Sequence, residues 1–202
     1  MKSLLLFTSL FFTTILFAQE SSNYFLVIDN DSIPISINEG IVYDVSKKKQ
    51  LNIQLIQPNF LTYNTDSFSF KHDKAFGTSN TKVDEGVYQH MVISPLGSGF
   101  ILQEFQDMNP EGMEKIFLNE ITKESLNYGY EKTEERVEIT LTDGKVIQGL
   151  EYKMTYKNEV EIYTVYTIGK KDEGLIIITM LLDDEESNVS LISKFLETLI
   201  IN

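Results

Sequence analysis

The sequence contains no cysteine and no tryptophan, and Arg136 is its single arginine among 202 residues. Without cysteine the chain forms no disulfide, offers no thiolate nucleophile or Cys-ligated metal, and has no cysteine for lipid attachment. A single arginine argues against a site that reads phosphate or carboxylate groups through arginine forks. The fold must therefore be held by its hydrophobic core, which is feasible because a domain of about 150 residues or more buries roughly 70% of its unfolded surface.

Positive charge is scarce as well. Asp and Glu number 30 against 17 Lys and Arg, so the formal net charge is −13. The only basic run is Lys47–Lys49. No basic patch of useful size exists, so we expect no nucleic-acid partner. The apolar and aromatic share of 42% and the charged share of 23% are those of an ordinary globular protein.

A long apolar run occurs only at the start of the sequence. Lys2 precedes the run from Leu4 to Phe17, and the small residue Ala18 follows it. This pattern is typical of a secretory signal peptide and is too short for a membrane span. We expect residues 1–18 to be removed and the protein to be exported, either to the periplasm or out of the cell. No later run reaches ~18 apolar residues, so we expect no membrane span in the mature chain.

The alternation of apolar and polar residues over 19–60 predicts a β-rich extension. Strands are expected over 24–28 and 33–37, with a turn at Asn30-Asp31, and further short strands over 41–43 and 51–55. Pro34 cannot donate a ladder hydrogen bond, so the second of these strands should lie at an edge.

Residues 61–202 predict one larger domain in which helices follow strands. Expected strands cover 68–71, 87–94, 100–106, 137–141, 146–157, 160–168 and 175–182, and the polar stretch 77–84 is expected to be a loop. Asn109 and Pro110 predict the start of a helix over 110–127 that Gly129 ends, and Asp143-Gly144 predicts a hairpin. A terminal amphipathic helix should begin with Ser187 as its N-cap.

Several short motifs of this domain match one family. They are Tyr63 with Phe68-Ser69-Phe70, Gly149 before an aromatic-rich strand, and the apolar run Leu175–Leu182 followed by Ser193-Lys194-Phe195. Over residues 60–202 the chain resembles the Mog1/PsbP-like fold of exported bacterial domains. The resemblance implies an α+β fold, an antiparallel sheet flanked by helices in an α/β/α sandwich. It also implies a role in binding other proteins as an assembly or accessory factor, and it supplies no catalytic residue. The tryptophan that such domains often carry after the opening strand is absent, and His72–Phe76 stands there.

The two histidines, His72 and His90, are candidates for a metal site with Asp73, or with Asp84 and Glu85. Zinc ligands are usually clustered at short spacing, whereas these histidines lie eighteen residues apart in a chain without cysteine. The interpretation as ordinary strand histidines is therefore favoured, and we expect no metal and no cofactor.

Other polar motifs match catalytic or calcium sites only in part. Ser98 lies between two glycines but lacks the strand-to-helix elbow of a serine hydrolase. The stretch Asp29–Ser32 begins like a calcium loop, but Pro34 and Gly40 stand where an EF-hand needs Gly and Glu. The acidic run Asp183–Glu186 is ordinary charge before a helix N-terminus.

Four tyrosines on adjacent predicted strands form the last candidate site: Tyr152, Tyr156, Tyr163 and Tyr166. They could form an exposed aromatic platform for a protein or glycan ligand. Alternatively they are strand residues packed under a helix, and this interpretation is favoured because large exposed apolar patches are exceptional.

The function expected from the sequence is that of an exported, non-enzymatic domain that binds a protein partner or assists an assembly. The alternatives are a small-ligand or calcium-binding module and, with less support, a hydrolase. Neither the partner nor the oligomeric state can be read from the sequence.

Overall fold

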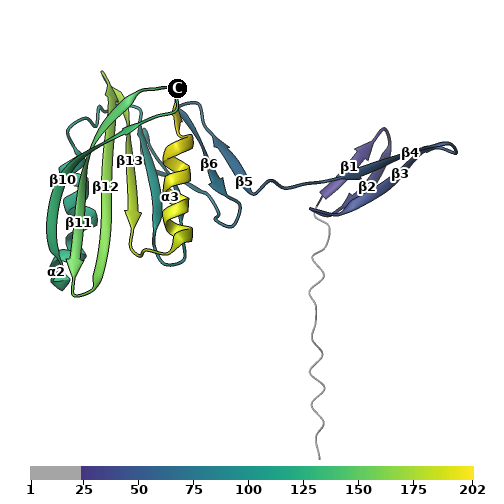
Figure 1. The fold of residues 1–202 in the computed structure, drawn as a ribbon. Coiled ribbons are helices and arrows are strands. Elements are labelled where there is room, and N and C mark those ends of the chain that lie inside the picture. The colour runs from purple at the N-terminus through teal and green to yellow at the C-terminus, as the bar shows by residue number, and fades with distance from the viewer. Residues whose placement is uncertain (1–23) are drawn as a thin grey trace, which may run out of the picture. The chain divides into compact units, whose positions relative to one another are not determined.

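The computed structural model describes residues 24–202 (Figure 1). The expected signal peptide at 1–18 lies outside the described residues. The chain divides into two compact units, one ending at Gln57 and the other spanning Pro58–Asn202. Within residues 24–202, no helix is long and apolar enough to cross a membrane.

The first unit consists of two antiparallel hairpins, β1 (Tyr24–Ile28) with β2 (Asp31–Ile35) and β3 (Gly40–Ser46) with β4 (Lys49–Gln54). Pro34 pairs with Phe25 in a sheet of two strands, where each strand is an edge, as predicted. The turn falls one residue earlier than expected, because Asp29 adopts the left-handed conformation at φ 51°. Ile35 is the buried hydrophobic residue of this unit.

The second unit is organised around a seven-stranded antiparallel sheet with the order β10-β11-β12-β13-β9-β8-β7. The strands are β7 (Ser79–Asp84), β8 (Val87–Ile93), β9 (Gly99–Phe105), β10 (Glu131–Thr140), β11 (Val146–Tyr156), β12 (Glu159–Lys170) and β13 (Glu173–Leu181). The Asp143-Gly144 hairpin is confirmed between β10 and β11, with Gly144 at φ 84°. The prediction of a loop over 77–84 was wrong: β7 is an edge strand whose side chains are all exposed, so it carries no apolar pattern.

One face of the large sheet is covered by α3 (Glu186–Thr198) together with a small sheet of β14 (Ile200–Ile201), β6 (Phe68–Asp73) and β5 (Phe60–Asn64). Figure 1 shows α3 in front of the large sheet with β6 and β5 beside it. The rings of Phe100 and Phe195 stack at 3.7 Å, and Phe70 meets both edge-on. The predicted strand Phe68-Ser69-Phe70 therefore places its two phenylalanines in the core cluster between the large sheet and α3.

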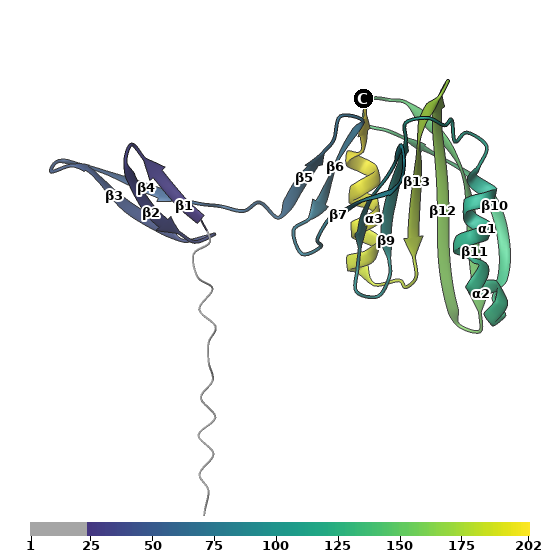
Figure 2. The ribbon, with the colours of Figure 1, turned by 180° about the vertical axis from the view of Figure 1, so that it is seen from behind.

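The opposite face packs against α1 (Glu114–Ile121), which α2 (Lys123–Tyr128) follows (Figure 2). Leu118 of α1 is buried with Tyr152, Met154 and Val165 of the sheet. On β13, the successive residues Leu175 to Ile178 alternate between this cluster and the one on the α3 side, as residues of a strand covered on both faces must.

The predicted start of the helix expected over 110–127 was wrong, whereas its predicted end at Gly129 is confirmed. Asn109 Oδ1 accepts the Glu111 N–H at 2.9 Å in a turn before the helix, and Gly112 at φ 82° prevents helical continuation. The helix therefore begins at Glu114. Gly129 ends α2 in the left-handed conformation at φ 113°.

Ser187 was also wrong as the N-cap of the terminal helix. The helix begins at Glu186, and no side chain caps it. Asp183 instead fixes the segment that precedes the helix. Its Oδ1 accepts hydrogen bonds from the Glu185 N–H at 3.0 Å and from the Asn188 side-chain amide at 2.8 Å. These hydrogen bonds lower the pKa of the Asp183 carboxyl group.

The fold is therefore mostly antiparallel β-sheet with three short helices. The side that α3 covers is not a purely helical layer, because the small sheet shares it.

Candidate functional site

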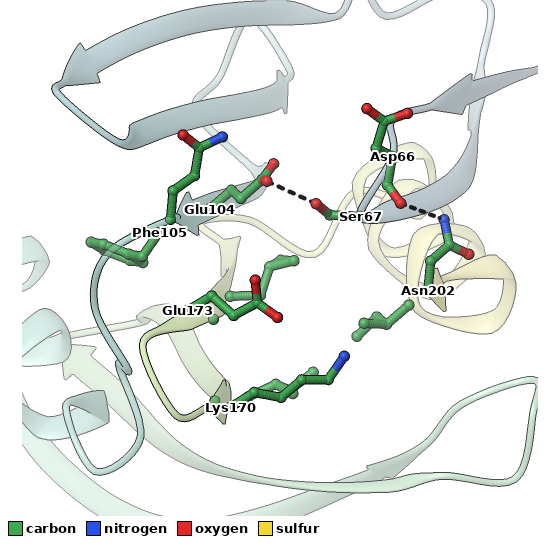
Figure 3. Close-up of a pocket in the computed structure, with 13 residues that line it drawn as sticks. Asp66, Ser67, Glu104, Phe105, Lys170, Glu173 and Asn202 are labelled. Carbon is green, nitrogen blue, oxygen red and sulfur yellow. Dashed lines mark hydrogen bonds between the residues drawn. The ribbon is translucent and has the colours of Figure 1, made fainter.

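A hollow of about 250 Å³ opens where the β12–β13 hairpin and the end of β9 meet the segment before β6 and the last strand (Figure 3). Its apolar lining comes from Phe105, Ile168, Leu175 and Ile201, of which Phe105 and Leu175 are buried. The floor of the hollow is therefore continuous with the hydrophobic core.

Charged side chains border this apolar floor. The rim carries the carboxylates of Glu104 and Glu173 and the ammonium group of Lys170, whereas Asp66 turns its backbone carbonyl toward Asn202 and its carboxylate away from the opening (Figure 3). Figure 3 shows Lys170 and Glu173 on one side of the opening and Asp66 with Ser67 on the other. Ser67 Oγ donates a hydrogen bond of 2.7 Å to Glu104 Oε1, which fixes that carboxylate.

The last strand closes the hollow by pairing with the segment before β6. The Asn202 N–H donates to the Ser67 carbonyl at 2.9 Å, and Asn202 Nδ2 donates to the Asp66 carbonyl at 3.0 Å. Thr65 Oγ1 accepts the N–H groups of both Ser67 and Phe68. The side chains of Thr65 and Asn202 and the Asn202 N–H therefore hold Asp66 and Ser67 at the rim.

Two glycines let the hairpin approach the turn before α1. A Cβ atom on Gly169 would collide with the Asn109 side chain, and one on Gly174 would collide with the ring of Pro110. Asn109 and Pro110, expected from the sequence to begin a helix, thus lie against the β12–β13 hairpin instead.

An apolar floor with a carboxylate rim suits a ligand that has an aliphatic stem and a cationic head. Carboxylates hold ammonium and guanidinium groups by charge-assisted hydrogen bonds, while the stem of Lys or Arg packs on apolar surface. The hollow, at about 250 Å³, has room for one such side chain.

The two histidines are buried in separate environments. His90 Nδ1 lies 2.8 Å from Tyr63 Oη, whereas His72 Nδ1 lies 2.9 Å from the Asp73 carbonyl oxygen. Burial lowers the pKa of His90, whose Nε2 is buried without a partner among the described residues. Across residues 24–202 no group of three or more His, Cys, Asp or Glu side chains could hold a metal ion.

The structure does not bring the four predicted tyrosines to one surface. Tyr152 and Tyr163 are cross-strand neighbours that are buried on the α1 side, and Tyr166 is buried on the α3 side. Tyr156 is partly buried and belongs to a different cluster, which sequence reasoning missed. Its ring centroid lies 5.1 Å from that of Tyr128 and 5.4 Å from that of Tyr130.

The two remaining polar motifs are structural. Ser98 is fully buried: its Oγ accepts the Leu182 N–H at 2.9 Å and donates to Asp183 Oδ2 at 3.3 Å. In the stretch Asp29–Ser32, the Asp31 carboxylate accepts the Tyr43 hydroxyl at 3.1 Å, which joins the two hairpins of the first unit.

No family model and no curated protein matches this chain. Among solved structures, the chain is similar to the solution structure of cyanobacterial PsbP (CyanoP) from Synechocystis sp. PCC 6803, at 10% sequence identity and a TM-score of 0.45. The similarity covers 71% of this chain and 93% of that chain. No residue role, ligand or partner is carried over from it.

Proposed function

We propose that this chain is an exported, non-enzymatic protein-binding domain of the Mog1/PsbP-like α/β/α type, which assists an assembly by holding a basic side chain of its partner. The observation that supports the proposal is the hollow whose apolar floor is bordered by the carboxylates of Glu104 and Glu173, which outnumber the one ammonium group at the same rim, that of Lys170. A lysine or arginine side chain of the partner enters it, with its stem on Phe105 and Leu175 and its charge at the rim.

The charge of the chain favours such a partner. The formal net charge of −13 attracts a basic surface and repels an acidic one, which increases the association rate and suppresses wrong partners. Protein interfaces also commonly draw most of their binding energy from a few side chains that enter desolvated pockets.

The test is a titration of the isotope-labelled chain from Gln19 onward with two short acetylated peptides, followed by NMR. One peptide carries a central lysine between two leucines, and the other carries norleucine at that position. We expect the lysine peptide to bind about tenfold more tightly, because a charge-assisted hydrogen bond contributes roughly 1.5–3 kcal/mol. The shifted resonances should belong to the β12–β13 hairpin and to Ser67.

Matched variants separate the hollow from general charge attraction. Glu104→Gln and Glu173→Gln should abolish the preference for lysine, whereas Glu124→Gln, an exposed acid on α2, should leave it unchanged. Equal affinity for the two peptides, or equal loss in all three variants, would overturn the proposal. The same variants then serve in cross-linking and capture from the native compartment, where the specific partner must be lost with Glu104→Gln and retained with Glu124→Gln.

A further inference from the structure

A second groove runs beside α3, on the face of the large sheet that α3 shares. It holds about 260 Å³ and lies over β11, β12 and β13. Figure 1 shows these strands next to α3. Its apolar walls are formed by Val189, Ile192 and Leu196 of the helix and by Ile162 and Leu181 of the sheet.

The floor of this groove is polar, which is unusual for a surface covered by a helix. Thr164, Tyr166 and Thr179 line it, and each of these side chains is at least nine-tenths buried. Thr164 Oγ1 donates to Glu151 Oε2 at 3.2 Å. The hydroxyl groups of Tyr166 and Thr179 have no hydrogen-bond partner among residues 24–202. Within the described residues the buried side-chain atoms without a partner are His90 Nε2 and Ser94 Oγ, so the two hydroxyl oxygens are open to the groove and can bond to a ligand there.

Gly149 creates the space in which Tyr166 lies. A Cβ atom at this position would meet the Tyr166 ring at Cδ1 and Cε1, so the ring lies across the glycine on the neighbouring strand. Burial, with a smaller contribution from the Glu151 charge, raises the pKa of Tyr166 to about 12. The phenol is therefore neutral at physiological pH and can donate a hydrogen bond into the groove.

An uncompensated pair of carboxylates stands at the edge of the groove. Glu151, which lines it, is the direct cross-strand partner of Glu135 on β10. Like charges in directly opposite positions of an antiparallel pair destabilise a sheet. Neither carboxylate forms an ion pair within the described part of the chain. A cation bound here would relieve the repulsion.

We infer that this groove is a binding site for a small free amine with a compact apolar body. The ammonium group lies against Glu151 and Glu135, the body packs between α3 and β12, and the hydroxyl groups of Tyr166 and Thr179 complete the hydrogen bonds at the floor. The site is separate from the acidic-rimmed hollow of the proposed function and does not depend on it.

The experiment uses cyclohexylmethylamine as the probe and cyclohexylmethanol as its neutral counterpart, titrated into the isotope-labelled chain and followed by NMR. We expect the amine to bind with a Kd of about 1 mM or below, and at least about tenfold more tightly than the alcohol. The shifted resonances should belong to α3 and β12. Absence of saturation by the amine at concentrations of about 10 mM, or equal affinity for the alcohol, would overturn the inference.

Matched variants locate the amine. Glu151→Gln should remove the preference for the amine, and Tyr166→Phe and Thr179→Val should each weaken binding several-fold. Tyr163→Phe, which alters a buried tyrosine on the opposite face, should leave binding unchanged. Glu173→Gln should also leave it unchanged, which keeps this site distinct from the hollow. If a lysine-bearing peptide competes for the groove and binds more tightly than the free amine, the site belongs to a peptide and the inference fails.

Discussion

Replacing Gly149 with alanine tests whether the close approach between β11 and β12 was identified correctly. The added Cβ atom would lie 2.8 Å from Tyr166 Cε1 and 2.9 Å from the Val165 carbonyl oxygen. Carbon atoms do not approach so closely, so the Tyr166 ring must move within a buried core. Such overpacking costs roughly 1–3 kcal/mol. Replacing a glycine in the middle of a strand by alanine in itself stabilises the fold by about 0.5–1 kcal/mol, because glycine loses more conformational freedom on folding.

The net effect should therefore be a loss of up to about 2.5 kcal/mol in the free energy of unfolding, which corresponds to a Tm lower by up to roughly 10 °C for a chain of this size. A double-mutant cycle assigns the loss to the ring. Gly149→Ala is measured by urea unfolding, monitored by circular dichroism, in the natural chain and in a Tyr166→Ala background.

In the background without the ring, the alanine should cost less, because the clash with the ring is gone and only the contact of 2.9 Å with the Val165 carbonyl oxygen remains. Contacting residues show interaction energies of about 0.5–3 kcal/mol in such cycles. A cost of Gly149→Ala that agrees in the two backgrounds within about 0.5 kcal/mol would refute the reasoning. The same variant should weaken amine binding in the α3 groove, because it displaces the Tyr166 hydroxyl group.

Three further predictions concern stability, each measured by urea unfolding. Phe195→Ala should lower the free energy of unfolding by about 3–5 kcal/mol because the ring is fully buried, whereas Phe25→Ala, at a side chain 62% exposed, should change it by less than about 0.5 kcal/mol. Burial lowers the pKa of His90 in the folded state from 6.5. Below that pH the imidazole therefore binds more protons in the unfolded state than in the folded state. Stability should therefore fall as the pH drops below 6.5, and His90→Gln should reduce that slope; an unchanged slope would contradict the assignment. Ser98→Ala leaves the Leu182 N–H without its acceptor and should cost about 1–3 kcal/mol, and a cost near zero would show that water replaces the hydroxyl group.

Local sequence patterns predicted much of the second unit. Alternating apolar residues located strands such as β6 and β10, and continuous apolar stretches located β12 and β13, which are covered on both faces. Gly129 and Asp143-Gly144 were confirmed because each needs a backbone conformation that glycine adopts at little cost. The pattern failed at β7, an exposed edge strand whose polar residues are indistinguishable from a loop.

The candidate sites were less predictable. Asp66, Glu104 and the hairpin that carries Lys170 and Glu173 are far apart in the sequence and share no motif, so nothing local marks them as one rim. The tyrosine platform, the less favoured of the two interpretations, rested on the nearness of two strands. Such a platform requires all the rings on one face of the sheet. Tyr163 and Tyr166 differ by an odd number of positions and so point to opposite faces of β12.

The sequence by itself determined the acidic charge, the absence of thiol chemistry, the alternation of the strands and the glycines at which the chain turns. These properties follow from composition and from the steric preferences of neighbouring residues. Only the tertiary structure decided that Ser67 positions Glu104, that Tyr166 lies across Gly149, and that Glu135 faces Glu151. Such contacts depend on strand order and register, which are set by packing between residues far apart in the chain.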